Sequence, residues 1–135
     1  MAEARDLRSR WIHLGRGATA TPQPATEDAA DPMAWYESYA ERTAADGAEG
    51  RLVALHEFSG DWEVWEIHPV GSEVVICTAG EMTLIQQTTA GERHIALTPG
   101  RYAINNAGVW HTADVPQSAQ ALFITAGQGT QHRPR

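Results

Sequence analysis

From Arg51 onward, the chain is a succession of short apolar or alternating runs, each ended by a turn that contains glycine or proline. Eight such runs occur in about 75 residues, and no helical periodicity separates them. They read RLVALHEF, WEVWEIHPV, EVVICT, EMTLIQQT, RHIAL, RYAIN, VWHTADV and QALFITA. Because parallel strands need long crossover connections, this pattern predicts an all-β, antiparallel sandwich or barrel over residues 51–127.

Residues 1–50 differ in character from this barrel region. The segment 1–31 is rich in arginine at first and then small, polar and proline-bearing, which is typical of an extended arm and linker. An N-cap and a first-turn proline, Asp31-Pro32, precede aromatic residues at helical spacing. The sequence therefore predicts an arm with little regular structure, one short helix over about 32–46, and a polar surface tail over 128–135.

Composition narrows the classes of partner and compartment. The chain has 135 residues, which suits one domain, and its formal charge of −7 at pH 7 argues against nucleic acid or anionic lipid as a partner. Its single cysteine excludes an intrachain disulfide and a cysteine metal cluster, as expected in a reducing compartment. No run is apolar enough for a signal peptide or a membrane span, so the sequence predicts a cytoplasmic protein.

Several side chains that can bind metal converge around the run WEVWEIHPVGSE. Residues two apart on a strand point to the same face, so Glu66 and His68 face together. Gly71 permits a tight turn, and a hairpin there brings the Glu73 carboxylate opposite this pair. His111 opens a later strand that a closed barrel can place in the same interior. On spacing alone, a solvent-facing Glu66 and a core His111 explain the pattern equally well.

The stretch from Gly60 to Val115 resembles the two sequence motifs of the cupin family. The first motif is G-x5-H-x-H-x3/4-E-x6-G, and the chain has Gly60, five residues, Glu66-Ile67-His68, four residues, Glu73, six residues and Gly80. The second motif is G-x5-P-x-G-x2-H-x3-N, and the chain has Gly100, five residues, Asn106-Ala107-Gly108, two residues, His111, three residues and Val115. The spacings match throughout. The resemblance implies a double-stranded β-helix (jelly-roll) barrel.

Three residues depart from the family pattern: Glu66 stands for a histidine, Asn106 for a proline and Val115 for an asparagine. The last two affect turn geometry more than chemistry. Glu66 changes the implied ligand set to two imidazoles and two carboxylates, whose charge balances a divalent cation. The resemblance thus implies one divalent ion per subunit, Fe, Mn, Zn or Ni, held by Glu66, His68, Glu73 and His111. The alternative is a degenerate barrel that binds its ligand with side chains alone.

Three further side chains are candidates for substrate binding around this site: Trp62, Cys77 and Tyr102. Trp62 shares the strand face of Glu66, and an indole there can stack on a flat or sugar-like molecule, although barrel packing is the simpler reading. Cys77 shares the strand face of Glu73 and has the simpler reading of a small buried side chain. Tyr102 follows the turn before a later strand. The remaining histidines are predicted to be surface or structural: His13, His56, His94 and His132.

The resemblance implies a choice among metal-dependent oxygenases, isomerases, epimerases, lyases and decarboxylases. The first hypothesis is therefore a metal-dependent enzyme that acts on a small molecule in the barrel interior, with Glu66 as a candidate catalytic base. The second is a non-catalytic barrel that binds or senses a small ligand, and the third is an assembly or storage role. Small cupins usually pair, and the apolar Trp11 and Ile12 need a core, so we expect a homodimer in which the arm adds a strand to the partner's sheet.

Overall fold

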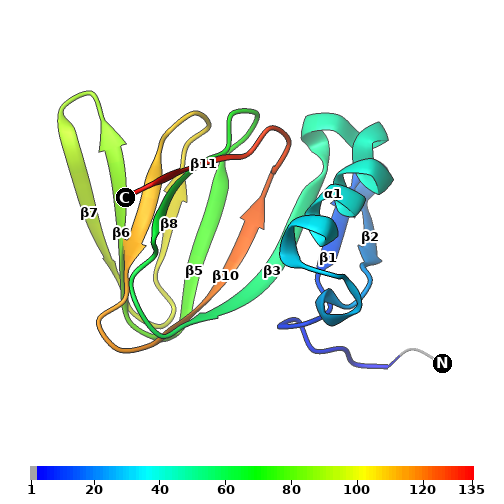
Figure 1. Cartoon of the computed structure of the whole chain (residues 1–135), viewed down its shortest axis with the longest axis horizontal. Coiled ribbons are helices and arrows are strands. Elements are labelled where there is room, and N and C mark those ends of the chain that lie inside the picture. The colour runs from blue at the N-terminus through cyan, green and yellow to red at the C-terminus, as the bar shows by residue number, and fades with distance from the viewer. Residues whose placement is uncertain (1–2) are drawn as a thin grey trace.

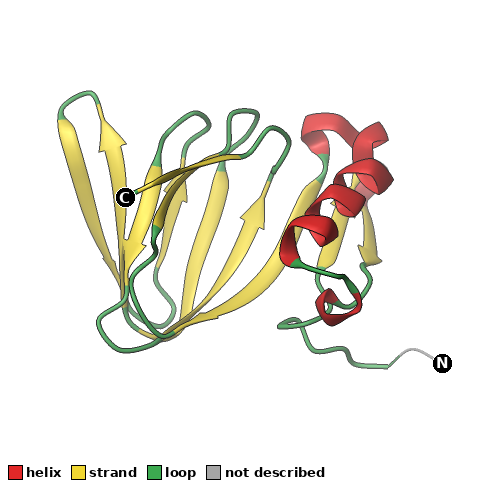
Figure 2. Cartoon of the chain, in the orientation of Figure 1, coloured by secondary structure: helices red, strands yellow, loops and turns green. Residues whose placement is uncertain are grey.

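The computed structural model describes residues 3–135 as two antiparallel β-sheets that face each other, with one α-helix beside them (Figure 1). The six-stranded sheet contains, in spatial order, β2 (Thr19–Pro22), β1 (Ile12–Gly15), β3 (Arg51–Phe58), β10 (Ala119–Thr125), β5 (Glu73–Gly80) and β8 (Tyr102–Asn105). The five-stranded sheet contains β11 (Gln131–Pro134), β4 (Val64–Ile67), β9 (His111–Asp114), β6 (Met82–Thr88) and β7 (Gly91–Leu97). Strands dominate the chain (Figure 2), which confirms the predicted all-β class.

Within residues 3–135, the helical segments all precede β3. The α-helix α1 (Pro32–Thr43) begins where the Asp31-Pro32 pair indicates, and the Asp31 carboxylate accepts a hydrogen bond from the Ala34 N–H at 2.8 Å. Three short 3₁₀ segments flank it: η1 (Arg16–Ala18), η2 (Thr26–Asp28) and η3 (Ala44–Glu49). No helix in the described part of the chain is long and apolar enough to cross a membrane.

The inner face of the six-stranded sheet carries two hydrophobic clusters side by side. Opposite residues of antiparallel strands share a face, and Ala54 of β3 lies opposite Phe123 of β10. Phe123 belongs to the cluster between the two sheets, whereas Ala54 packs with Leu52, Trp11 and Trp35. Helix α1 therefore covers the part of this face that lies beyond the five-stranded sheet, as its position over β1 and β3 in Figure 1 also shows.

The N-terminal segment differs from the predicted arm of little regular structure. Strands β1 and β2 form a hairpin, and β1 also pairs with β3, so the hairpin extends the six-stranded sheet of its own chain. Trp11 is only 6% exposed and meets Trp35 of α1 edge-on, with 4.7 Å between the ring centroids. Trp11 is thus buried against the aromatic residues of α1 within its own chain. The arm no longer argues for strand exchange with a partner chain.

The C-terminal segment also differs from the predicted polar tail, because residues 131–134 form β11 and pair with β4. This strand is held in place by charged side chains, which a search for hydrophobic periodicity does not detect. The Arg133 guanidinium lies 4.4 Å from the centroid of the Trp110 ring and 5.7 Å from that of Trp65. Arg135 forms an ion pair with Asp114 at 2.8 Å. Cation–π stacking and an ion pair therefore replace the apolar alternation that usually indicates a strand.

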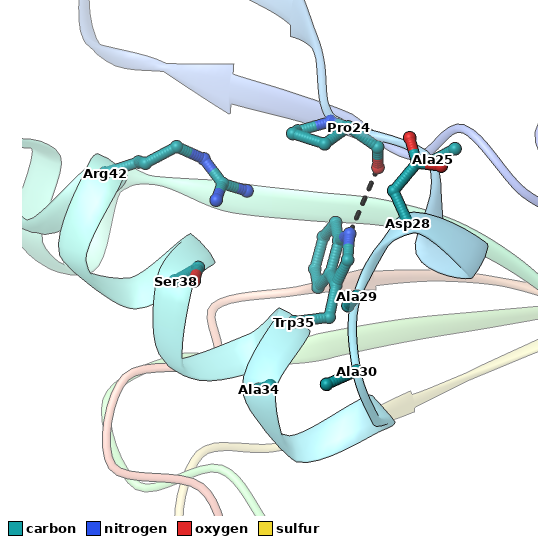
Figure 3. A pocket seen from close by; sticks show the side chains of 9 residues that line it. All are labelled: Pro24, Ala25, Asp28, Ala29, Ala30, Ala34, Trp35, Ser38 and Arg42. Carbon is teal, nitrogen blue, oxygen red and sulfur yellow. Dashed lines mark hydrogen bonds between the residues drawn. The ribbon is translucent and has the colours of Figure 1, made fainter.

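A groove lies between α1 and the segment that precedes it (Figure 3). The Trp35 indole N–H closes one side by donating a hydrogen bond to the Pro24 carbonyl oxygen at 3.0 Å. The groove is lined mainly by small side chains, and the larger Arg42 also lines it. Its lining includes none of the residues that the sequence selected for a site. Glu66, His68, Glu73 and His111 lie instead in the interior between the two sheets.

Candidate metal centre

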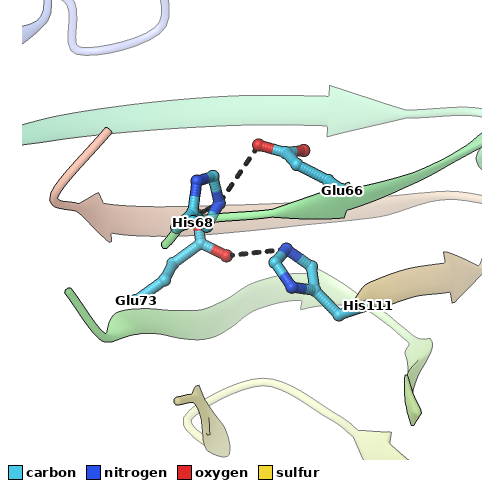
Figure 4. A group of neighbouring side chains, drawn as sticks. All are labelled: Glu66, His68, Glu73 and His111. Atoms are coloured by element: carbon cyan, nitrogen blue, oxygen red, sulfur yellow. Dashed lines mark ion pairs between the residues drawn. The ribbon is translucent and has the colours of Figure 1, made fainter. Parts of the chain in front are cut away.

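Four titratable side chains from three strand regions meet between the two sheets (Figure 4). Glu66 lies on β4, His68 just after it, Glu73 begins β5 and His111 begins β9. Glu66 and His111 are direct neighbours across the β4–β9 ladder. One potential ligand atom from each residue lies within 4.8 Å of those of the other three. The structure thus brings together the four residues that the sequence motifs selected.

The four side chains differ in their exposure to solvent. The His111 side chain is 0% exposed, and those of His68 and Glu73 are nearly as buried, whereas that of Glu66 is 23% exposed. The His68 Nε2 atom lies 3.1 Å from Glu66 Oε1 and 3.1 Å from Glu73 Oε2. The His111 Nε2 atom lies 3.3 Å from Glu73 Oε1. Glu66 therefore forms the solvent side of the cluster and Glu73 its buried side.

The hydrogen-bond partner of each outer imidazole nitrogen, Nδ1, determines the tautomer of the ring and therefore whether the inward nitrogen, Nε2, carries a lone pair. His68 Nδ1 lies 2.8 Å from Thr130 Oγ1, and the Thr130 hydroxyl already donates to the Gly127 carbonyl oxygen. Thr130 therefore accepts from His68 Nδ1–H. His111 Nδ1 lies 3.2 Å from the Val109 carbonyl oxygen, which can only accept. In the neutral rings, both Nε2 atoms therefore carry lone pairs that point into the cluster.

These inward nitrogens are the observation that tests the site for a metal ion. Both Nε2 atoms are buried, and neither forms a hydrogen bond of acceptable geometry within the described chain, although carboxylate oxygens lie nearby. Buried polar atoms normally have a partner. Two imidazole lone pairs and two carboxylates form a donor set that suits a divalent first-row cation. The residues present therefore fit the metal that the motifs imply.

Neutral donors fix the Glu73 carboxylate in place. The Asn105 amide donates to Oε1 at 3.0 Å, and the Thr125 hydroxyl donates to Oε2 at 2.6 Å. Gln86 in turn donates to the Asn105 side-chain oxygen at 2.9 Å, which orients the Asn105 amide. Asn105 is itself buried. Glu73 is thus held rigidly by outer partners, in the way that ligating carboxylates usually are.

Electrostatics within the cluster show that it needs a positive charge. Burial by itself raises the pKa of the Glu73 carboxyl, but the adjacent imidazoles of His111 and His68 outweigh burial and hold that pKa well below its usual range. Burial by itself lowers the pKa of His68, but the carboxylates of Glu66 and Glu73 outweigh it and raise the pKa to about 9. A buried carboxylate and a partly exposed one this close together require a compensating cation. A proton on His68 meets this need, and so does a divalent ion.

The three candidate substrate residues lie in different places. Trp62 is half-buried beside the cluster, with 6.3 Å between the centroids of its ring and that of His111. Cys77 is fully buried in the hydrophobic core and follows the simpler reading of a small core side chain. Tyr102 is 64% exposed, because Ala103 and Asn105 take the inward positions of β8. The structure thus places Tyr102 away from the interior, which corrects its assignment to the site.

An aromatic layer connects α1 with the cluster. Successive ring centroids lie 5.0 Å apart from Trp11 to His56, 5.5 Å from His56 to Phe123, and 6.1 Å from Phe123 to Trp62. Tyr36 of α1 contacts the Trp11 end of this layer, with 5.8 Å between ring centroids. Tyr36 is itself 40% exposed. Helix α1 is therefore linked to the cluster by a continuous row of aromatic contacts.

Sequence reasoning missed the residues that support the cluster from outside. His132, which was predicted to be surface or structural, lies opposite Glu66 in the β11–β4 ladder, with its Nε2 3.8 Å from Glu66 Oε2. Thr130 and Thr125 contact the inner residues from outside both motifs, whereas Asn105 lies inside the second motif, at a position that the motif leaves variable. Only the position of Asn105 therefore offered a signal.

No protein-family model and no curated protein matches the sequence, but solved structures do. A protein with a double-stranded β-helix domain from Klebsiella pneumoniae aligns at a TM-score of 0.51 and 20% identity, over 63% of this chain and 76% of that chain. An oxalate oxidase aligns at 0.51 and 14%, over 59% of this chain and 44% of that one. A cupin-2 domain protein from Shewanella frigidimarina aligns at 0.48 and 21%, over 63% and 71%. This likeness shows that the chain has the double-stranded β-helix fold of cupins.

Proposed function

We propose that this cupin-fold chain is a metal-dependent enzyme that acts on a small molecule, and that Glu66, His68, Glu73 and His111 hold one divalent ion. The proposal rests on one observation above all. Two buried imidazole nitrogens with inward lone pairs face two carboxylates, and they form no hydrogen bond in the described chain. Unless a metal ion binds or an imidazole takes up a proton, this arrangement places acceptor atoms against each other.

The donor set favours Fe(II) or Mn(II), and Zn(II) and Ni(II) are also compatible with it. A bound ion of this kind supplies Lewis acidity toward a substrate oxygen or, for iron and manganese, redox chemistry. Glu66, His68, Glu73 and His111 would hold such an ion, and an ion that accepts more ligands than these four would also bind a substrate or water.

Glu66 is the residue we assign to proton transfer. Glu73 is buried and held by two neutral donors, so its carboxylate is fixed. Glu66 is partly exposed, and its Oε1 is directed toward His68 while Oε2 is directed outward. At the solvent side, where His132 Nε2 at 3.8 Å is its ion-pair neighbour, Glu66 Oε2 can accept a proton from a bound molecule. Glu66 thus serves both as a ligand and as the catalytic base.

Trp62 is the residue we assign to binding the organic part of the substrate. Its ring lies beside His111, and its indole N–H is buried without an acceptor in the described part of the chain. An unpaired buried donor next to a metal centre can donate to a substrate oxygen. The neighbouring ring of Phe58, 5.5 Å away between centroids, supplies an apolar surface for the remainder of the molecule.

Metal analysis tests the first half of the proposal. Protein purified without a metal-binding tag is analysed by mass spectrometry, before and after incubation with Fe(II), Mn(II), Zn(II) or Ni(II). We expect close to one equivalent in the parent and strong loss in His68→Gln and His111→Gln. His94→Gln is the matched control, because His94 is exposed and, among residues 3–135, its ring pairs with Glu92 alone. Failure of the parent to take up any of these ions overturns the proposal.

Nitric oxide tests the second half, because it binds to ferrous ions that have an open position. The Fe(II)-loaded protein is treated anaerobically with nitric oxide, and the spin-3/2 electron paramagnetic resonance signal of the adduct is measured. An adduct is the expected result. A loaded protein that gives no adduct has no position for a substrate, and this result overturns the enzyme assignment in favour of a non-catalytic binding barrel.

A further inference from the structure

Two of the four proposed ligands receive outer contacts from a single short segment at the C-terminus, residues 127–135. Thr130 accepts the hydrogen bond from His68 Nδ1 at 2.8 Å, and it lies just before β11. Two residues further along, the His132 side chain lies opposite Glu66 on the same face. The segment therefore reaches one imidazole and one carboxylate of the cluster, although it lies outside both sequence motifs.

We propose, on the basis of the metal site proposed above, that residues 127–135 are the positioning element of its solvent side. Thr130 fixes the tautomer and the ring orientation of His68, so that Nε2 presents a lone pair to the ion. His132 holds the outer oxygen of Glu66, so that Oε1 stays directed inward. Neither residue is a ligand. Outer partners of this kind typically change metal affinity by about 10- to 100-fold.

The contrast with Glu73 supports the role of His132. Each Glu73 oxygen accepts a hydrogen bond from a neutral side chain, Asn105 or Thr125. Within residues 3–135, no side-chain hydrogen bond reaches Glu66, whose Oε2 has His132 as its ion-pair neighbour at 3.8 Å. His132 has no other ion-pair partner in the described chain and is 48% exposed. Closure of this distance by a side-chain rotation would give Glu66 the outer contact that Glu73 already has.

The anchoring of β11 supports the same role. A strand that carries a positioning residue must itself be held, and β11 pairs with β4 at four successive positions. The Arg133 side chain lies on the opposite face of the strand from His132, where it packs on Trp110 and Trp65. Gly127 and Thr130 form a turn that is closed by the Thr130 N–H donating to the Gly127 carbonyl oxygen at 3.2 Å. Both ends of the segment are therefore fixed relative to the cluster.

Manganese affinity tests the proposal in paired variants of the full chain. The fraction of free Mn(II) is measured by electron paramagnetic resonance for Thr130→Val and Thr130→Ser, and for His132→Ala and His132→Gln. We expect about 10-fold or greater weakening in Thr130→Val and His132→Ala, and near-parent affinity in the two conservative variants, which keep an oxygen acceptor or an N–H donor. Arg133→Ala, which touches no ligand, should also weaken binding. His94→Ala is the control.

Two further measurements keep the outcomes separate. Pulsed electron paramagnetic resonance counts the imidazoles bound to Mn(II), and we expect two in both the parent and His132→Ala. A count of three in the parent makes His132 a ligand and overturns its positioning role. Urea unfolding of the metal-free variants shows whether each still folds. Parent-like affinity in both Thr130→Val and His132→Ala overturns this inference but leaves the proposed function standing, whereas a parent without Mn(II) affinity overturns both.

Discussion

The buried and the solvent sides of the candidate metal centre are built by different means. On the buried side, Glu73 is surrounded by short neutral hydrogen bonds from Asn105 and Thr125. On the solvent side, Glu66 contacts His68 and faces the exposed His132. One carboxylate is held by two hydrogen bonds, and the other only by the approach of His132 at 3.8 Å. In such a site, Glu73 serves to hold the ion and Glu66 serves to transfer a proton.

The largest expected effect comes from removing the rigid carboxylate. Glu73→Gln should weaken Mn(II) binding by at least about 100-fold, beyond the usual loss for an outer partner, because Glu73 contacts both imidazoles. Glu66→Gln should weaken binding less than Glu73→Gln does, since water can enter at the exposed position, but at least as much as His132→Ala does. Isothermal titration calorimetry at one pH compares the two variants. Equal losses would show that the two sides do not differ, and a larger loss in Glu66→Gln would show that the solvent side holds the ion more strongly.

The next effect concerns the stability of the metal-free protein. Asn105→Ala removes a buried amide that bridges Gln86 and Glu73, and leaves an acceptor and a donor without partners. We expect a loss of about 1–3 kcal/mol in the free energy of unfolding by urea. His132→Ala removes only a loose, exposed ion-pair contact and should cost less than about 0.5 kcal/mol. A reversed order would mean that the solvent side carries the stability.

The sequence predicted the four inner residues of the site because their spacing is carried by two motifs on local strands. The strand period of two places Glu66 and His68 on one face of β4 and its continuation. The predicted hairpin at Gly71 is wrong, because β4 and β5 lie in different sheets, and the turn instead carries the chain from one sheet to the other and so brings Glu73 opposite the pair. His111 required the longer second motif. The fold class followed from the same evidence, because glycine turns and short apolar runs leave few alternatives to an antiparallel barrel.

The sequence did not predict the outer supports, and the reason is physical. Strand β11 carries Gln131, His132, Arg133 and Pro134, which show no apolar alternation, and it is held by cation–π stacking on tryptophans far along the chain. The β1–β2 hairpin is likewise stabilised by a long-range contact, that of Trp11 with Trp35. Local pattern reasoning registers burial only where it repeats along the chain. It does not register a single long-range aromatic contact.

A smaller effect on stability is expected from His56, which lies in the aromatic layer between α1 and the metal centre. Burial lowers the pKa of His56 from its ordinary value of 6.5, although the carboxylates of Glu66 and Glu73 act in the opposite direction. The folded protein therefore keeps His56 neutral where the unfolded chain takes up a proton. This contribution to stability is complete above about pH 6.5 and is lost as the pH falls below that value.

The pH dependence of unfolding tests this effect. The free energy of unfolding is measured by urea between about pH 7.5 and 5.5 for the parent, for His56→Phe and for the control His94→Gln. We expect the parent and the control to lose more stability toward pH 5.5 than His56→Phe, which has no proton to take up on unfolding. Parallel curves for all three proteins would show that the negative charges of the site offset the effect of burial on His56.

The smallest expected effect comes from Tyr102, on the same strand as Asn105 but on the opposite face. Tyr102→Ser should leave Mn(II) affinity unchanged and alter the free energy of unfolding by less than about 0.5 kcal/mol, because its side chain is mostly exposed. The same calorimetric and urea measurements apply. A tenfold loss of affinity would return Tyr102 to the site and would mean that β8 reaches the ion from both faces. An unchanged affinity beside a destabilised Asn105→Ala confines the support of Glu73 to the inner face of β8.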